Sequence, residues 1–161
     1  MEYIECPDTY EGDLPTVFLA GGITDCPDWQ QEAVGILAHT ELALLNPRRR
    51  DFPIHDPRAA YEQVTWEFEQ LNDADVILFW FPASVSVQPI ALYELGRHAV
   101  RNTRLIVGAD SDYSRRRDVE IQLALARGPG FPIYCTLDAV CAQVEGMEHM
   151  LHKLPPRRLR P

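Results

Sequence analysis

The chain has 161 residues, of which 46 % are hydrophobic and 24 % are charged, and its formal net charge is -9. These proportions are typical of one soluble globular domain and exclude a disordered chain, a collagen and a coiled coil. The negative charge argues against a general binder of nucleic acid polymers or anionic membranes. No apolar run reaches the roughly 18–20 residues that a membrane helix needs.

The cysteines give no sign of a disulfide framework or a metal site. Cys6, Cys26, Cys135 and Cys141 form no C-x-x-C pair and no cluster with histidine at zinc spacing. The acidic first residues carry no apolar signal segment. We therefore expect free thiols, a cytoplasmic protein and no bound metal.

The first predicted elements alternate between strand and helix. Residues 1–15 are polar and contain proline and glycine, which predicts an irregular lead-in. The apolar run 16–20 ends in Gly21-Gly22 and predicts a buried parallel strand. A helix is predicted over 29–40 and a second strand over 42–45.

The middle of the chain contains its most hydrophobic run. Residues 47–58 form a loop rich in proline and arginine, and a helix over 59–72 follows. This helix has an apolar stripe, composed of Tyr61, Val64, Phe68 and Leu71. Residues 76–81 are all apolar and predict the central strand, buried on both faces.

The last elements continue the alternation. We expect a helix over 90–101, a strand over 105–108, a helix over 118–127, a short edge strand over 131–135 and a helix over 138–151. Residues 153–161 form a basic tail of prolines and arginines. The pattern predicts one α/β domain over 16–152, with a doubly wound, five-stranded parallel sheet and helices on both faces.

Ligands of such sheets bind at the carboxyl ends of the strands, near the point where the strand order reverses. This rule selects the loops at 21–28, 47–58, 82–89 and 109–117. Gly21-Gly22 allows a ligand to approach the backbone, but it is neither a dinucleotide fingerprint nor a P-loop. A tight turn without a ligand is the alternative.

Glu94 is the most informative carboxylate. It lies within the first two turns of a predicted helix that Pro89 opens, and its neighbours Tyr93 and Leu95 are apolar. A helix N-terminus favours an ionised carboxylate, and apolar surroundings exclude water. These features favour a nucleophile, whereas an exposed helix position is the commoner role of a lone glutamate.

Glu67 is the second candidate. By helical periodicity it lies close to the apolar stripe of its helix, so we expect it to be half-buried. Partial burial raises the pKa of a carboxylate and allows it to donate a proton. Two carboxylates on neighbouring helices suit glycosyl transfer, in which one attacks the anomeric carbon and an acid assists the leaving group.

Five segments carry a family resemblance. They are VFLAGGI at 17–23 followed by Asp28-Trp29-Gln30, NPRR at 46–49, QVTWE at 63–67, DVILFWF at 75–81 and PIALYELG at 89–96. In this order they resemble the nucleoside 2-deoxyribosyltransferase family, in its bacterial deoxyribosyltransferase-like branch. The resemblance implies a flavodoxin-like sheet, exchange of the base on a 2'-deoxynucleoside, no cofactor, and a nucleoside or nucleotide and a free nucleobase as partners.

The resemblance also implies roles for single residues. Glu94 matches the nucleophile that forms a covalent 2-deoxyribosyl enzyme, and Glu67 matches the acid that serves the base. The substrate-binding positions that we carry over or expect are Gly21, Gly22, Trp29, Asn46, Arg48, Trp80 (or Phe81), Gln88 and Asp118. The family also implies a homo-oligomer with sites completed across subunits, through apolar faces on the helices around 61–71 and 90–101.

Two positions depart from the family pattern. Gln88 stands where many relatives have an acid that holds the sugar hydroxyls, and Ser84 and Ser86 lie close to it. Such uncharged residues are similar to those of the related 5'-monophosphate N-glycosidases. Asp118 stands where the branch has an asparagine that can reach a neighbouring subunit's site.

The arginine-rich loops leave the substrate open. Residues 48–50 and 115–117 are all arginine and predict a phosphate site if they face the cleft. Otherwise they are solvated loop arginines on an acidic surface. The alternatives to a transferase are therefore a 2'-deoxynucleoside 5'-monophosphate N-glycosidase and a module that binds a nucleotide-derived ligand without turnover.

Overall fold

Six strands form one parallel sheet in the computed structural model, which describes residues 1–155. They are β1 (Glu2–Glu5), β2 (Thr16–Gly21), β3 (Ala43–Asn46), β4 (Val76–Phe81), β5 (Leu105–Ala109) and β6 (Ile133–Tyr134). Their order across the sheet is β1-β3-β2-β4-β5-β6, and every neighbouring pair is parallel. Without β1, this is the flavodoxin-like order.

The prediction of five strands was wrong by one, because a strand lies within the segment interpreted as an irregular lead-in. β1 pairs along β3, from Glu2 opposite Ala43 to Glu5 opposite Asn46. Only Ile4 of this strand is buried. A short edge strand with one buried side chain has no apolar run by which it could be recognised.

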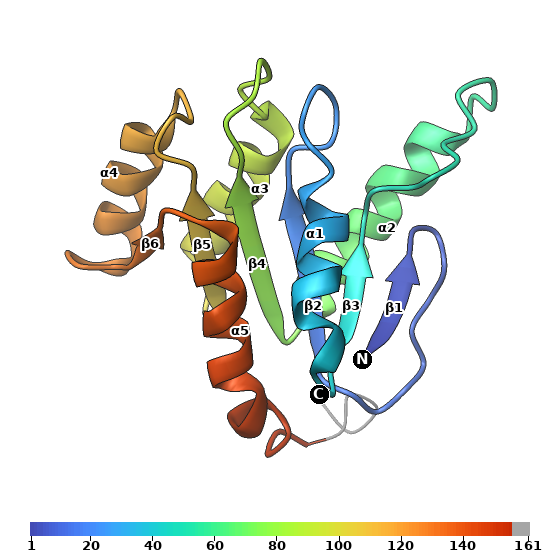
Figure 1. The fold of residues 1–161 in the computed structure, drawn as a ribbon. Helices are drawn as coiled ribbons and strands as arrows, with labels where there is room; N and C mark the ends of the chain where they lie inside the picture. Colours follow the sequence, from blue (N-terminus) through green and yellow to red (C-terminus); the bar gives the residue numbers. More distant parts are fainter. Residues whose placement is uncertain (156–161) are drawn as a thin grey trace.

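Five helices of the described residues cover the two faces of the sheet (Figure 1). They are α1 (Trp29–Ile36), α2 (Ala59–Asp73), α3 (Pro89–Ala99), α4 (Arg116–Arg127) and α5 (Leu137–Leu151), and a short 3-10 helix, η1 (Leu37–His39), extends α1. Helices α1 and α5 lie on one face, and α2, α3 and α4 lie on the other. Among the described residues no helix is long and apolar enough to span a membrane. Most of the expected basic tail, from residue 156 onward, lies outside the described residues.

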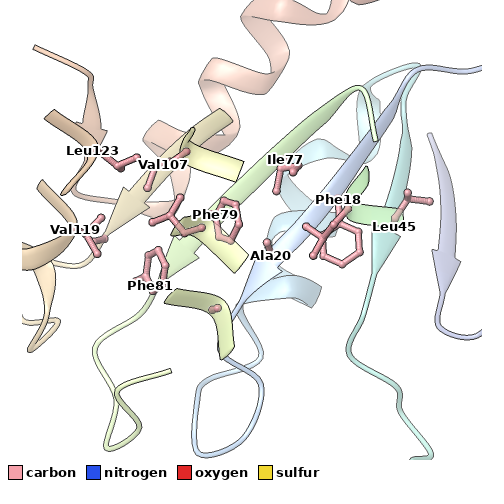
Figure 2. Close-up of a cluster of buried hydrophobic side chains, with 14 of the residues drawn as sticks. Phe18, Ala20, Leu45, Ile77, Phe79, Phe81, Val107, Val119 and Leu123 are labelled. Atoms are coloured by element: carbon pink, nitrogen blue, oxygen red, sulfur yellow. The ribbon is translucent and has the colours of Figure 1, made fainter. Parts of the chain in front are cut away.

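Strand β4 is buried along its whole length and separates two cores. Phe79 and Phe81 point to the side of α2, α3 and α4, where Val107, Val119 and Leu123 surround them (Figure 2). Leu78 and Trp80 point to the side of α1 and α5. This double burial explains why the strand is an unbroken apolar run, as the sequence predicted.

Helix α2 does not bury the predicted stripe. Tyr61 is 78 % exposed, Val64 63 % and Phe68 51 %, and only Leu71 of the stripe faces the core. Trp66 packs against the sheet instead, with its ring centroid 5.8 Å from that of Phe18. The helix has apolar residues on two sides, and the large Trp66 ring occupies the side nearest the sheet. Three large apolar side chains are therefore left on the surface.

Gly21 closes β2 where no side chain fits. A Cβ there would lie 2.2 Å from the carbonyl oxygen of Trp80 and 2.7 Å from the Trp29 ring. We expect Gly21→Ala to lower the free energy of unfolding by about 1–3 kcal/mol, because backbone must move to admit the methyl group. Urea denaturation measures this, with Gly35→Ala in α1 as the control, where a Cβ meets nothing within 4 Å. Equal stabilities of the two variants would contradict the close packing.

Candidate active site

The sheet reverses its strand order between β2 and β4, and Gln88 joins the loops that follow these strands. Its Oε1 accepts a hydrogen bond from Gly22 N at 2.9 Å, and its Nε2 donates to Pro82 O at 3.0 Å and to Ser84 Oγ at 3.3 Å. Gln88 is buried, and its φ of 53° lies in the left-handed region. A Cβ on Gly22 would lie 2.6 Å from Gln88 Cδ. Gln88 therefore fixes the entry to α3, and its amide is used within the protein.

The loop after β3 belongs to the same network. Arg48 donates to Pro27 O at 2.7 Å and to Cys26 O at 3.1 Å, and its backbone N–H donates to Asn46 Oδ1 at 2.8 Å. Trp29 Nε1 donates to Gly22 O at 3.0 Å. The structure thus brings six predicted binding residues together at the carboxyl ends of β2, β3 and β4: Gly21, Gly22, Trp29, Asn46, Arg48 and Gln88. Within this set Gln88 and Trp29 both bind Gly22, and Arg48 binds Asn46. Their role toward a substrate stays a prediction.

The two predicted catalytic glutamates lie on adjacent helices of one sheet face, Glu67 on α2 and Glu94 on α3. Both are partly buried. Burial raises the pKa of each carboxyl, and for Glu94 the nearby Glu67 carboxylate raises the pKa further, to about 8. Arg97, one turn further along α3, opposes this shift. At neutral pH the pair therefore retains a proton, held on Glu94. Burial outweighs the helix N-terminus, so the expectation of an ionised Glu94 is wrong for the free protein.

Sequence reasoning missed two residues next to this pair. Gln63 donates from Nε2 to Glu67 Oε1 at 2.7 Å, and this bond favours the ionised form of Glu67. The guanidinium of Arg97 lies 4.5 Å from the centre of the Phe68 ring, and its Nε is buried without a hydrogen-bond partner. The i, i+4 spacing of Gln63 to Glu67 and the i, i+3 spacing of Glu94 to Arg97 were the available signals.

The structure does not bring Trp80 and Asp118 to the glutamates. Trp80 is a core residue on the sheet face of α1 and α5, opposite the helices of the two glutamates. Phe81, the alternative wall, is also buried and stacks on Tyr113 with 5.2 Å between ring centroids. Asp118 is exposed on the first turn of α4 and lies 3.3 Å from Arg115.

The loop arginines form ion pairs within the chain. Arg49 lies 2.9 Å from Glu62, and Arg116 and Arg117 both contact Glu120, at 3.0 Å and 3.3 Å. The two groups follow β3 and β5, and β2 and β4 lie between these strands. The described contacts fit surface ion pairs on an acidic protein better than one shared phosphate site.

An open cavity of about 500 Å³ lies at the edge of the sheet beside β1. It is lined by Tyr3, Glu5, Cys6, Pro7, Asp8, Arg49, Arg50 and Asp51. Neither Glu67 nor Glu94 lines it.

Comparison with known proteins points to one family. A family model described as "nucleoside 2-deoxyribosyltransferase like" matches residues 14–113. The matched span runs from β2 to β5 and contains both glutamates and the whole Gln88 network, whereas β1, α4 and α5 lie outside it. No curated protein matches the chain.

Proposed function

Since the chain belongs to the nucleoside 2-deoxyribosyltransferase-like family, we propose that it exchanges the base of 2'-deoxynucleosides through a covalent intermediate on Glu94. The observation that supports this most is the coupled pair of partly buried carboxylates, Glu67 and Glu94, on adjacent helices. A carboxylate pair with raised pKa values destabilises a fold and is typical of catalytic sites.

In the first step a carboxylate oxygen of Glu94 attacks C1' of the sugar. The bond from C1' to the base nitrogen breaks, and its electron pair goes to the base, which takes a proton from Glu67. The products are a glycosyl ester on Glu94 and the free base. Positive charge develops on the sugar in the transition state, and the carboxylate of Glu94 stabilises this charge.

In the second step a nitrogen of the acceptor base attacks C1' on the face from which the first base left. The ester bond breaks, Glu94 departs as a carboxylate, and the proton of the acceptor base returns to Glu67. Two inversions at C1' retain the configuration. The cycle needs one proton on the pair, and near neutral pH the free protein holds it on Glu94, whose pKa is about 8. The first step therefore requires this proton to pass from Glu94 to Glu67 before Glu94 attacks.

Hydrolysis of a 2'-deoxynucleoside 5'-monophosphate is less well supported. A phosphate site needs free cations or hydroxyls, and the arginines that flank the loops have acidic or carbonyl partners. Ser84 Oγ donates to Ser86 O at 2.9 Å, so the hydroxyl hydrogen of Ser84 is used within the loop, and Ser86 Oγ accepts from Gln88 N at 3.1 Å. A pure binding module would have no need of a destabilising carboxylate pair.

We also propose that the protein is a homo-oligomer. Large apolar side chains are exposed on α2 and α3, close in sequence to the two glutamates: Tyr61, Val64, Phe68, Ile90 and Tyr93. Covering them with a second copy would bury apolar area and exclude water from the carboxylates. Light scattering tests this, and a monomer at high concentration would contradict it.

The function is tested by incubating the protein with thymidine or 2'-deoxyinosine and free adenine, and in parallel with 2'-dAMP alone. Chromatographic detection of 2'-deoxyadenosine supports transfer. Release of free adenine from 2'-dAMP without need of a second base would replace the proposal by an N-glycosidase. Tight binding of a nucleotide without any product would favour a binding module.

A further inference from the structure

The N-terminal segment reaches the candidate acid although it lies outside the family match. Cys6 follows β1, and its backbone N–H donates to Asn46 O at 3.0 Å. Its thiol donates to Gln63 Oε1 on α2 at 3.1 Å. Two residues later, Asp8 O accepts from Trp66 Nε1 at 2.8 Å. The segment that follows β1 is therefore held against the helix that carries Glu67.

The side-chain amide of Gln63 has only one orientation that satisfies its neighbours. Its Nε2 lies 2.6 Å from Pro47 O and 2.7 Å from Glu67 Oε1. A backbone carbonyl only accepts hydrogen bonds, so the NH₂ group must face Pro47, and its two hydrogens serve these two oxygens. The amide oxygen then faces Cys6, whose thiol is protonated because burial raises its pKa to about 12. In each of these three contacts a hydrogen-bond donor faces an acceptor.

This arrangement makes the two oxygens of Glu67 unequal. Oε1 accepts a short hydrogen bond from a donor that cannot rotate, so a proton taken up by the carboxyl resides on Oε2. We propose that Gln63, oriented by Cys6 and Pro47, is a positioning residue that fixes Glu67 so that Oε2 carries the proton given to the departing base. This inference rests on the proposed function and extends it, and neither Gln63 nor Cys6 contacts the substrate.

The charged groups around Glu67 do not fix its orientation in the same way. From α3, Glu94 repels a second negative charge, and Arg97 partly offsets this repulsion. On the side of β1 and β3, Arg49 and Glu62 pair with each other at 2.9 Å. The hydrogen bond from the amide is thus the contact that distinguishes one carboxyl oxygen from the other.

The variant Gln63→Met tests the proposal, because methionine has a similar length and cannot donate a hydrogen bond. We expect kcat to fall about 10- to 100-fold with KM within about twofold, as for a contact that acts on the transition state. The alkaline limb of the pH profile should move to higher pH, because loss of the donor raises the pKa of Glu67. Gln143→Met, at an exposed position of α5, is the matched control and should leave both quantities unchanged.

Two variants at Cys6 test whether its thiol orients Gln63. Cys6→Ser keeps a donor and is expected to retain kcat within about twofold, whereas Cys6→Ala removes the donor and should lower kcat several-fold. If serine and alanine gave the same kcat, Cys6 would have no orienting role.

A Gln63→Met protein that folds and keeps the wild-type kcat and pH profile would overturn the proposal. The proposal would also be overturned if the loss of rate equalled the loss of folded protein, which circular dichroism measures. NMR titration of ¹³C-labelled glutamate in both proteins reads the pKa of Glu67 without turnover. If the wild type exchanges no base, the proposed function fails, and an unchanged Glu67 titration in Gln63→Met would separately refute the contact.

Discussion

The variant Glu94→Gln is expected to lose base exchange by about 10⁴-fold or more, and to unfold at a higher temperature than the wild type above pH 8. The loss of rate follows because an amide does not attack C1' to form an ester. The gain in stability follows because the wild type must ionise a partly buried carboxyl beside Glu67.

The sign of the pH dependence is set by a folded-state pKa of about 8, above the ordinary value of 4.5. Between these two pH values the unfolded chain releases the Glu94 proton and the folded chain keeps it, so stability falls as pH rises. Above pH 8 the ionised Glu94 lowers the free energy of unfolding by its full amount, about 2–4 kcal/mol. Glutamine has no proton to lose and escapes this penalty.

Thermal unfolding at pH 5 and pH 9 measures this effect. We expect Glu94→Gln to match the wild type within a few degrees at pH 5 and to exceed it by about 5–10 °C at pH 9. Glu69→Gln removes the same charge from an exposed position of α2 and should change neither stability nor rate. A Glu94→Gln protein that is less stable at pH 9 would contradict the raised pKa.

Replacing Glu67 by glutamine is expected to lower kcat by about 10²–10⁴-fold and to change KM by only a few-fold. The reason is that the departing base loses its proton donor in the transition state, whereas binding in the ground state is retained. The alkaline limb of the pH profile should disappear, because the shared proton is no longer required. The pKa of Glu94 should also fall, because Glu67 no longer repels its ionised form.

A substrate whose leaving group departs as a stable anion separates this role from a structural one. Such a group needs no proton, so Glu67→Gln should turn it over at nearly the wild-type rate. Steady-state kinetics with both kinds of substrate provide the measurement, and Glu69→Gln is again the charge-matched control. An equal loss on both substrates would mean that Glu67 is not an acid.

The fold was predictable where burial follows the local pattern. Strand β4 has the predicted bounds because both of its faces are buried and no polar residue interrupts it. The outer face of α2 was not predictable, because a periodic stripe does not reveal which side packs on the sheet. The orientation of α2 follows from the contact of Trp66 with Phe18, which lies 48 residues earlier in the sequence.

The candidate site shows the same limit. The motifs identified Glu67 and Glu94 separately, but their coupling depends on how α2 and α3 pack on the sheet. The sequence marked Gln88 as a departure from the family, but only the structure shows that its amide is bound to Gly22 and Pro82. The contact of Cys6 with Gln63 bridges 57 residues and has no local signal.

Mass spectrometry of the protein, quenched during turnover of a 2'-deoxynucleoside without acceptor base, tests the covalent mechanism most directly. The mechanism predicts a mass increase equal to one 2-deoxyribosyl group, located by peptide mapping on Glu94 and absent from Glu94→Gln. Turnover to free base with no adduct at any quench time, or an adduct on another residue, would contradict Glu94 as the nucleophile.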